Sequence, residues 1–383
     1  MAASPLRGQA AVIGTGTFGM GEAPGFGSLD LAAGAGLLAL RDAGLAVSDV
    51  DALYVCTPDD MLSGLSLAEY LGIHPAITGN NRTGGSAFLT HVMSAALALQ
   101  AGLCKVALIT YGSNLRTAGA RTVAAPGASP HETPYQLSLA ASYALAASRH
   151  MHRYGTTREQ LASVAVAARA WAALNPDAFM RDPLTIEDVL AARTVATPFG
   201  VRDCCLVTDG GAAIVLTGAD FARERRRRPA YLLGGGEATT HRYIAQMPDL
   251  TVTGAAQSGA TAYGQAGLGP RDVDVLQLYD AFTINPVLFL EDLGFCGKGE
   301  GGAFVAGGRT APGGSLPVNT NGGGLSCVHP GMYGLFAIVE GVRQVFGECG
   351  PRQVPDADVA LVHGNGGVLS HQATLIFGSP ATL

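Results

Sequence analysis

The chain has 383 residues, of which 48% are hydrophobic and only 14% are charged. This length can hold one large or two medium domains, and the low share of charged residues argues for broad buried surface, including a subunit interface. A net charge of −6 argues against a general nucleic-acid-binding surface. The seven cysteines are irregularly spaced and match neither a disulfide framework nor a zinc-binding pattern. We therefore expect a protein of the reducing cytoplasm without a bound metal.

The N-terminal segment predicts a buried strand followed by a helix. Residues 10–14 (AAVIG) are apolar, and residues 14–19 match the dinucleotide motif G-x-G-x-x-G. That motif requires a helix to begin at the glycines, but a proline and two further glycines follow within two turns. We expect the helix from about Ser28 to Ala43 instead, so the match does not indicate a nucleotide site.

A stretch without charged residues extends from Thr83 to Cys104. It is long enough to be weighed as a membrane span, but it is rich in Gly, Ala and Ser and contains His91 and Gln100. We expect a helix buried in the centre of the protein and no membrane span. The first fourteen residues lack the apolar core of a signal peptide, which agrees with a cytoplasmic location.

The second part of the sequence echoes the first. The pattern A-G-L-x-x-x-D-V-D-x-L occurs at 43–53 and again at 266–276. Three weaker echoes keep the same order: 106–109 with 359–362, 81–86 with 319–324, and 209–212 with 365–368. We therefore predict two duplicated halves, residues 1–230 and 231–383, each built from helix, strand, Gly-rich turn, apolar helix and strand.

A helical insertion is expected within the first half, over about residues 113–197. Helical spacing extends from His150 to Ala173, with a break at 154–157 and a helix start signal from Thr157 to Gln160.

Residues 273–283 (VDVLQLYDAFT) carry the clearest functional signal. A predicted strand ends in Tyr279-Asp280, and an apolar helix-like run follows from Pro286 to Leu293. In α/β proteins, titratable residues at the junction between a strand and the following helix often take part in catalysis. Read alone, this segment favours a buried tyrosine and a helix-capping aspartate, and the repeat elsewhere in the chain gives the functional interpretation its weight.

Several motifs together resemble the thiolase superfamily, in particular its sterol-carrier or lipid-transfer-protein branch. These motifs are 151–157 (MHRYGTT), 203–210 (DCCLVTDG), 279–282 (YDAF), 319–323 (NTNGG) and His329-Pro330. The resemblance covers essentially the whole chain. It implies an α/β protein with a five-layered α-β-α-β-α fold, a homodimer formed through the N-terminal half, and acyl-CoA thioesters as substrates with no covalently bound cofactor.

The nucleophile of that family is missing. Thiolases carry a catalytic Cys at the start of the central helix of the N-terminal half, where this chain has Arg82. No Cys lies between Cys56 and Cys104. An acyl-Cys intermediate cannot form at its usual place, so a Claisen-type thiolase is not expected.

The other family positions are partly kept. Tyr279 stands where the branch has a catalytic His, while His329 keeps the His of the Gly-His-Pro motif, although Val328 replaces the Gly. A late Cys, which handles the substrate α-proton in the family, falls on or beside His363.

The remaining groups suit retro-aldol cleavage of a β-hydroxyacyl-CoA into a ketone or aldehyde and a short acyl-CoA, because this reaction needs a base and oxyanion donors but no acyl-enzyme. We predict Tyr279 and His329 as the acid/base pair, Asp280 as an orienting residue, and His363 as a further candidate for catalysis or substrate orientation. The candidates for substrate binding are Arg82, Gly85, Asn319, Asn321, Asn365 and Gly366. A cation at Arg82 could lower the pKa of Tyr279, bind a carboxylate or bridge a dimer.

The Tyr-Asp pair and the missing Cys are similar to a subgroup of thiolase-like aldolases that shorten steroid acyl-CoA side chains. That subgroup works with a small OB-fold, zinc-ribbon protein, or with such a domain fused to a hydratase, so the resemblance implies a partner of this kind. Its second catalytic residue is a Tyr where this chain has His329. Two alternatives remain open: an acyltransferase or condensing enzyme, and a non-catalytic scaffold that binds acyl-CoA or lipid.

Overall fold

The computed structural model describes residues 6–120, 137–224 and 227–383. Nine strands form its main sheet, in the order β3-β2-β4-β7-β1-β8-β11-β10-β9. They are β1 (Ala10–Gly21), β2 (Ala52–Val55), β3 (Ile77–Gly79), β4 (Val106–Ser113), β7 (Asp209–Gly218), β8 (Ala230–Thr239), β9 (Val275–Leu278), β10 (Val359–Gly366) and β11 (His371–Gly378).

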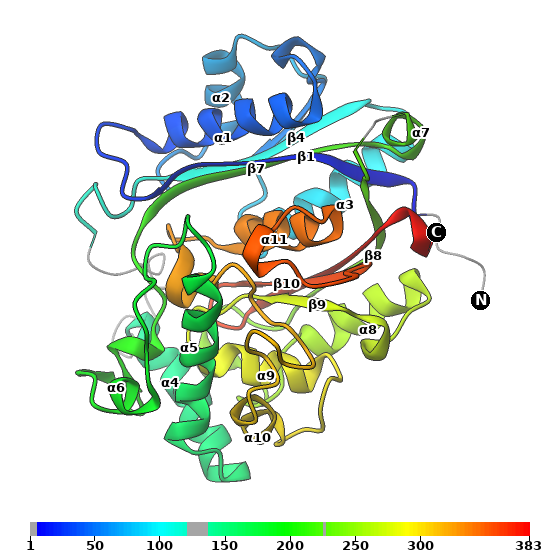
Figure 1. Ribbon diagram of the computed structural model, residues 1–383. Helices are drawn as coiled ribbons and strands as arrows, with labels where there is room; N and C mark the ends of the chain where they lie inside the picture. Colours follow the sequence, from blue (N-terminus) through cyan, green and yellow to red (C-terminus); the bar gives the residue numbers. More distant parts are fainter. Residues whose placement is uncertain (1–5, 121–136, 225–226) are drawn as a thin grey trace.

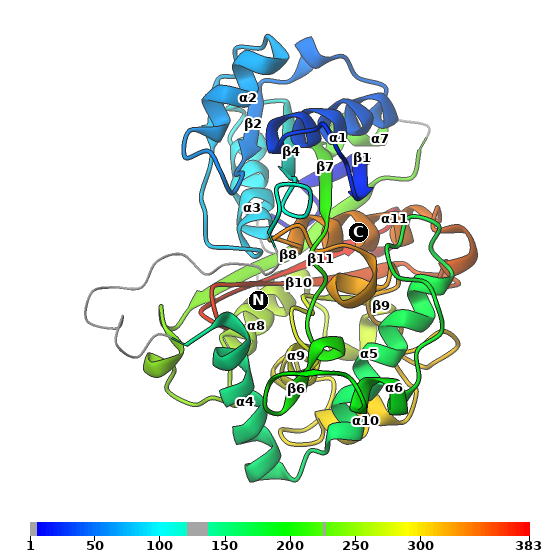
Figure 2. The ribbon, with the colours of Figure 1, turned by 90° about the vertical axis from the view of Figure 1, so that its left-hand side faces the viewer.

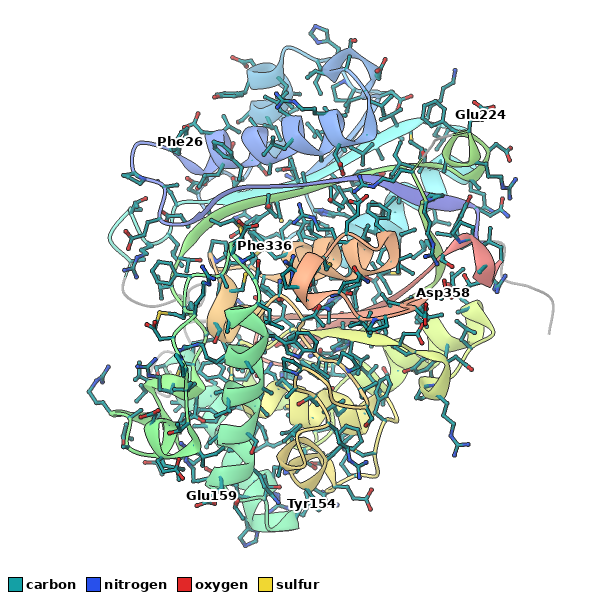
Figure 3. The ribbon with its side chains drawn as sticks, viewed as in Figure 1. Phe26, Tyr154, Glu159, Glu224, Phe336 and Asp358 are labelled. Atoms are coloured by element: carbon teal, nitrogen blue, oxygen red, sulfur yellow. The ribbon has the colours of Figure 1, made fainter. Side chains whose placement is uncertain are left out.

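Helices and strands alternate in five layers, as the sequence predicted (Figure 1). The helices that build the layers are α1 (Ser28–Ala43), α2 (Ser63–Leu71), α3 (Ala87–Gln100), α8 (Ala255–Ala266), α9 (Ile284–Asp292) and α11 (Gly334–Phe346). α1 and α2 cover the outer face of the group formed by β1, β2, β4 and β7. α3 and α11 lie between the two groups of strands, and α8 and α9 cover the other side. Phe336 of α11, labelled in Figure 3, lies in this middle layer with its ring against those of Tyr111 and Tyr333.

The two groups of strands repeat one topology. Counting inward from the outer edge, the first group runs β2, β4, β7, β1 and the second runs β9, β10, β11, β8. β3 pairs with β2 at one edge, and an isolated parallel bridge from Val318 to Leu276 takes its place at the other. The two groups meet where Ala11 and Val12 pair with Tyr231 and Ala230. This arrangement agrees with the predicted duplication, and the predicted division after residue 230 would fall at the first residue of β8.

One predicted echo does not correspond to equivalent positions. Asp209 begins β7, whereas residues 365–366 end β10, so these segments lie on different strands of the repeat. Their similarity comes from glycines that both serve close packing.

The G-x-G-x-x-G segment lies inside β1 and starts no helix, as expected. A Cβ at Gly14 would lie 2.4 Å from the carbonyl oxygen of Ala39, and one at Gly16 would lie 2.3 Å from that of Ala35. The glycines therefore allow α1 to pack directly on the strand.

α3 is the predicted central helix, and most of its residues are buried. Among the described residues, no helix is long and apolar enough to cross a membrane.

The segment between β4 and β7 holds the helical insertion and extends to residue 208, farther than predicted. Its helices are α4 (Leu139–Tyr154), α5 (Arg158–Ala173) and α6 (Ile186–Leu190), with the short strands β5 (Thr194–Ala196) and β6 (Phe199–Gly200). Figure 2 shows α4, α5 and α6 grouped at the end of the molecule away from α1 and α2. Thr157 and Gln160 form the capping box that begins α5, as their spacing predicted.

Candidate active site

Tyr279 follows directly after β9 and is 4% exposed. Its backbone N–H donates to the carbonyl of His363, which continues the parallel pairing of β9 with β10. Its hydroxyl lies 3.0 Å from Nε2 of His329 and accepts the backbone N–H of Tyr333 at 3.1 Å. The predicted acid/base residues are therefore in direct contact, although 50 positions separate them in the sequence.

Burial sets the protonation of this pair. It raises the pKa of Tyr279 well above the usual value, against the N–H of Tyr333, which lowers it. Burial also lowers the pKa of His329 to about 4. At neutral pH the pair is thus a phenol and an uncharged imidazole, and we assign the phenol as donor to Nε2. Nδ1 of His329 has no hydrogen-bond partner among the described residues.

Asp280 holds the turn that precedes His329. Its carboxylate accepts the backbone N–H of Gly324 at 2.6 Å and that of Leu325 at 3.3 Å. Gly323 has a φ of 64°, and a Cβ there would lie 2.0 Å from the carboxylate. Burial raises the pKa of Asp280 to about 7, and the two backbone donors oppose this rise. Asp280 therefore anchors the His329 turn and does not itself touch the phenol hydroxyl.

The two predicted asparagines, Asn319 and Asn321, hydrogen-bond to residues that adjoin Tyr279 and His329. The side-chain oxygen of Asn319, whose φ is 53°, accepts the N–H of Leu278 at 2.7 Å. That of Asn321 accepts the Tyr333 hydroxyl at 2.9 Å and the N–H of Gly323 at 2.8 Å. These contacts position β9 and the turn, which is a different role from the substrate binding that we predicted.

Gly85 brings the start of α3 against the phenol. A Cβ at Gly85 would lie 1.9 Å from Cε2 of Tyr279 and 2.7 Å from its hydroxyl. Arg82, in contrast, is exposed and turns away: its guanidinium donates to the carbonyls of Thr57 at 2.5 Å and Asp60 at 2.6 Å. The structure gives no support to the idea that Arg82 lowers the pKa of Tyr279.

His363 does not belong to this site. Side chains alternate between the two faces of a strand, and a Cβ at Gly364 would point at Leu89 of α3. His363 points the other way, with its ring against Phe289 of α9. Its Nδ1 bonds to Thr374 at 2.9 Å and its Nε2 to Gln372 at 2.8 Å. The predicted catalytic role of His363 is therefore corrected to a buried structural one, and the residue of β10 that faces the start of α3 is Gly364.

Asn365 and Gly366 face opposite sides in the same way. The amide of Asn365 donates to the Tyr143 hydroxyl at 2.7 Å, and that hydroxyl donates to the carbonyl of Gly367 at 3.1 Å. Gly366 faces the start of α3, since a Cβ there would lie 2.0 Å from the carbonyl oxygen of Thr83. Gly366 thus joins the Tyr279 site, whereas Asn365 ties the insertion to the end of β10.

The cysteines offer no activated nucleophile. All seven lie in the described part of the chain and are free thiols. Burial raises the pKa of each, for example to about 12 for Cys56 and Cys204 and to about 11 for Cys104. A reactive thiol requires the opposite shift.

Tyr333 was missed by the motif comparison. Its backbone N–H reaches the Tyr279 hydroxyl, and its ring meets that of Tyr279 edge-on at 5.6 Å. Its place four residues after His329, just before α11, was an available signal.

The comparisons with known proteins agree with this fold. A family model described as thiolase C-terminal domain-like matches residues 236–379. The acetyl-CoA acetyltransferase of Methanothermobacter thermautotrophicus is 36% identical and covers 96% of this chain and 98% of its own length. The 17-hydroxy-3-oxo-4-pregnene-20-carboxyl-CoA lyase of Mycobacterium tuberculosis is 37% identical and covers 89% of this chain and 92% of its own. A solved structure, that of an Ltp2-ChsH2(DUF35) aldolase, is 34% identical, with a TM-score of 0.89 over 98% of both chains.

The chain therefore belongs to the thiolase superfamily. Within the superfamily it lies in the sterol-carrier branch that its motifs indicated, among relatives that include steroid side-chain-cleaving aldolases.

Proposed function

We propose that this chain is a thiolase-like aldolase, a carbon–carbon lyase that cleaves a β-hydroxyacyl-CoA into a ketone or aldehyde and a short acyl-CoA. The observation that carries the proposal is the buried contact of Tyr279 with His329 beside Gly85, in a fold whose usual nucleophilic Cys is missing. The names of two relatives, a pregnene-carboxyl-CoA lyase at 37% identity and a steroid side-chain-cleaving aldolase at 34%, support it. They also favour a bulky, steroid-like acyl group.

The chemistry follows from the two uncharged groups. The substrate β-hydroxyl gives its proton to the Tyr279 oxygen while the phenol proton moves to Nε2 of His329. The bond between the α- and β-carbons then breaks, so the β-carbon becomes a carbonyl and the electron pair remains on the thioester as an enolate. A proton added to the α-carbon completes the short acyl-CoA. The proton held on Nε2 of His329 passes to water when the product leaves, so the proton taken up at the α-carbon and the proton released from the β-hydroxyl cancel, and no further reactant is needed.

The enolate oxygen needs hydrogen-bond donors. Gly84 packs against the turn after β10, because a Cβ at Gly84 would lie 2.9 Å from the backbone nitrogen of Gly367 and 3.0 Å from Cα of Gly366. Backbone N–H groups of these two segments are the donors that we assign to the thioester oxygen.

The direct test is the substitution Tyr279→Phe, assayed by the release of short acyl-CoA from a steroid-type β-hydroxyacyl-CoA. We expect kcat to fall by about 10²–10⁴, the usual worth of a positioned acid or base. Tyr263→Phe is the matched control. It removes a hydroxyl from a partly buried residue of α8, which donates to the carbonyl of Leu293 and takes no part in the contact of Tyr279 with His329. Turnover that is the same in both variants would refute the proposal.

An acyltransferase is the second candidate, favoured by the 36% identity to an acetyl-CoA acetyltransferase. The raised thiol pKa values weigh against it, since acyl transfer needs a thiolate. Mass spectrometry after incubation with acetyl-CoA distinguishes the two: a stable acetyl adduct on a Cys would favour the transferase. Tight CoA binding with neither adduct nor cleavage would favour the non-catalytic scaffold.

We also propose a homodimer that forms through the N-terminal half. β3 is the terminal strand of the sheet order, and three large apolar side chains nearby are exposed: Met61 by 81%, Leu62 by 60% and Leu65 by 61%. Such a patch beside an open strand edge suits a subunit contact. Light scattering should give twice the chain mass, and Leu65→Glu should shift it toward the monomer; a monomeric wild type would contradict this.

A partner with an OB-fold and a zinc ribbon is a further proposal. Its support is the solved relative, an aldolase whose name joins Ltp2 with ChsH2(DUF35). Co-expression with a DUF35 protein encoded nearby should yield one complex on size exclusion, whereas separate elution would count against a stable partnership.

A further inference from the structure

Ser86 lies at the start of α3 and is fully buried. A serine in this position normally caps the helix, but its hydroxyl makes no capping bond to α3, a helix that is described throughout. The hydroxyl instead lies 3.1 Å from Oγ1 of Thr83 and 2.8 Å from Nδ1 of His371. The first residue of β11 is thus hydrogen-bonded to the residue that precedes α3.

The second nitrogen of His371 faces a carboxylate. Its Nε2 lies 3.5 Å from Oε2 of Glu237, whose side chain is 46% exposed. The same oxygen accepts the Thr90 hydroxyl at 2.7 Å. Burial lowers the pKa of His371 below its usual value, and the Glu237 carboxylate opposes this shift only in part, so the ring is charged only while it carries a proton of the relay. His363, which is uncharged at neutral pH, is the other titratable neighbour that interacts with this imidazole.

These groups adjoin the Tyr279 site. Ser86 follows Gly85, which lies against the phenol. On the other side, a Cβ at Gly366 would lie 2.4 Å from Oγ of Ser86, and one at Gly364 would lie 3.1 Å from its Cα. Two glycines of β10 therefore make the room in which the Ser86 hydroxyl sits. Thr83 is partly exposed whereas Ser86 is fully buried, so Thr83 is the hydroxyl of the two that lies nearer the surface.

We propose that Thr83, Ser86 and His371 form a proton relay that protonates the α-carbon of the thioester enolate, with Glu237 as the counter-ion of the imidazolium. This inference rests on the proposed lyase function, in which Tyr279 and His329 serve the β-hydroxyl and leave the α-carbon without an acid. The Thr83 hydroxyl gives its proton to the α-carbon, Ser86 reprotonates Thr83, and Nδ1 of His371 reprotonates Ser86. Water recharges the relay through Thr83 once the product has left, so Thr83 is the catalytic residue and the other two act through it.

The relay also runs backward, which allows a test that does not depend on cleavage. In D₂O, the purified chain should exchange the α-hydrogens of acetyl-CoA and propionyl-CoA for deuterium, as followed by mass spectrometry. We expect Ser86→Ala and Thr83→Val to lower this exchange by about 100-fold, and Thr83→Ser, which keeps the hydroxyl, to retain it. Glu237→Gln, at a side chain that is 46% exposed, should lower exchange by about 3–10-fold by removing the counter-ion.

Two controls separate this relay from the rest of the site. Ser258→Ala removes a buried hydroxyl that bonds to Thr374 at 2.9 Å, away from α3, and should leave exchange unchanged. Tyr279→Phe should lower cleavage by about 10²–10⁴ but keep exchange within about threefold, since the phenol serves the other carbon.

The outcomes are distinct. Exchange by Ser86→Ala and Thr83→Val at the level of Ser258→Ala would overturn the relay and leave the lyase proposal standing. A wild-type chain that exchanges no α-hydrogen and cleaves no substrate would overturn both. Loss of exchange in Ser86→Ala and Thr83→Val, with rescue by Thr83→Ser, would establish the relay.

Discussion

The two halves of the molecule end equivalent strands in different ways. β2 of the N-terminal half is followed by Cys56 and Thr57, whereas β9 of the C-terminal half is followed by Tyr279 and Asp280. All four residues are buried, but the two in the C-terminal half place a phenol and a carboxyl group in the interior. The two halves thus share one strand order, and the candidate acid/base groups lie in one of them.

The glycine turns at corresponding positions of the two halves have different roles in the site. Gly84 and Gly322 occupy matching places with φ values of 96° and 102°. The next residue in each turn lies against the same site: Gly85 against the Tyr279 ring and Gly323 against the Asp280 carboxylate. The N-terminal turn therefore provides room for the phenol, and the C-terminal turn fixes the histidine that serves it.

The largest effect is expected from Gly323→Ala in the C-terminal turn. The methyl group would meet the Asp280 carboxylate, and the positive φ adds strain. Together these should lower the free energy of unfolding by about 2–4 kcal/mol, measured by urea denaturation. Gly264→Ala is the control, because its Cβ would meet open space on α8 and should raise stability by up to about 1 kcal/mol. Equal stability of the two variants would contradict the role of this turn.

Gly85→Ala tests the N-terminal turn. Its methyl group would overlap the phenol ring and push the hydroxyl away from His329. We expect a loss of about 1–3 kcal/mol in stability and a fall in turnover of about 100-fold or more. If turnover is retained while stability falls, catalysis does not depend on the present position of the Tyr279 hydroxyl.

Buried histidines should behave alike in both halves. Burial lowers the pKa of His91 on α3 and of His363 on β10 to about 4. Between about pH 6.5 and 4 these histidines are protonated in the unfolded chain and uncharged in the folded chain. The free energy of unfolding therefore falls as the pH drops through this range, by up to about 1.4 kcal/mol per pH unit for each histidine.

The substitutions His91→Gln and His363→Gln should each flatten this dependence by that amount, in urea denaturation between pH 7 and 5. Asp280, with its raised pKa, works in the opposite direction over pH 4 to 7, because the folded chain there binds the extra proton. An unchanged slope in both variants would show that these histidines have the same pKa in the folded and the unfolded chain.

The smallest effect is expected from Arg82→Ala. Its guanidinium is exposed and bonds to two loop carbonyls, so we expect a loss of about 1 kcal/mol or less and turnover within about threefold of the wild type. A large fall in kcat would instead place Arg82 at the substrate and restore the role first predicted for it.

Much of the fold could be predicted from sequence, because its signals are local. The repeat of A-G-L-x-x-x-D-V-D-x-L marks the approach to β2 and β9, and the capping box at Thr157 marks the start of α5. The contact of Tyr279 with His329 followed from family motifs that the chain keeps at both positions.

The predictions that failed concerned the direction in which a side chain points. His363 and Gly364 are neighbours in sequence, yet a shift of one residue along a strand exchanges its two faces, and the glycine is the one that faces α3. Arg82 sits in the expected loop, but its long side chain turns outward to Thr57. The contact of Ser86 with His371 joins residues 285 positions apart and left no local pattern to find.

The short pairing of β1 with β8 has a consequence for how activity is gained during folding. In the part of the chain that the structure describes, the strands of the two halves pair only at residues 11–12 with 230–231, and one isolated bridge joins Cys204 to Phe282. Tyr279 and Gly85 come from different halves, so the site is complete only after the halves have docked. Domains of this size commonly acquire secondary structure before they dock. On dilution from denaturant, the helical circular dichroism signal should therefore recover first, and the catalytic rate should return in a later, slower phase.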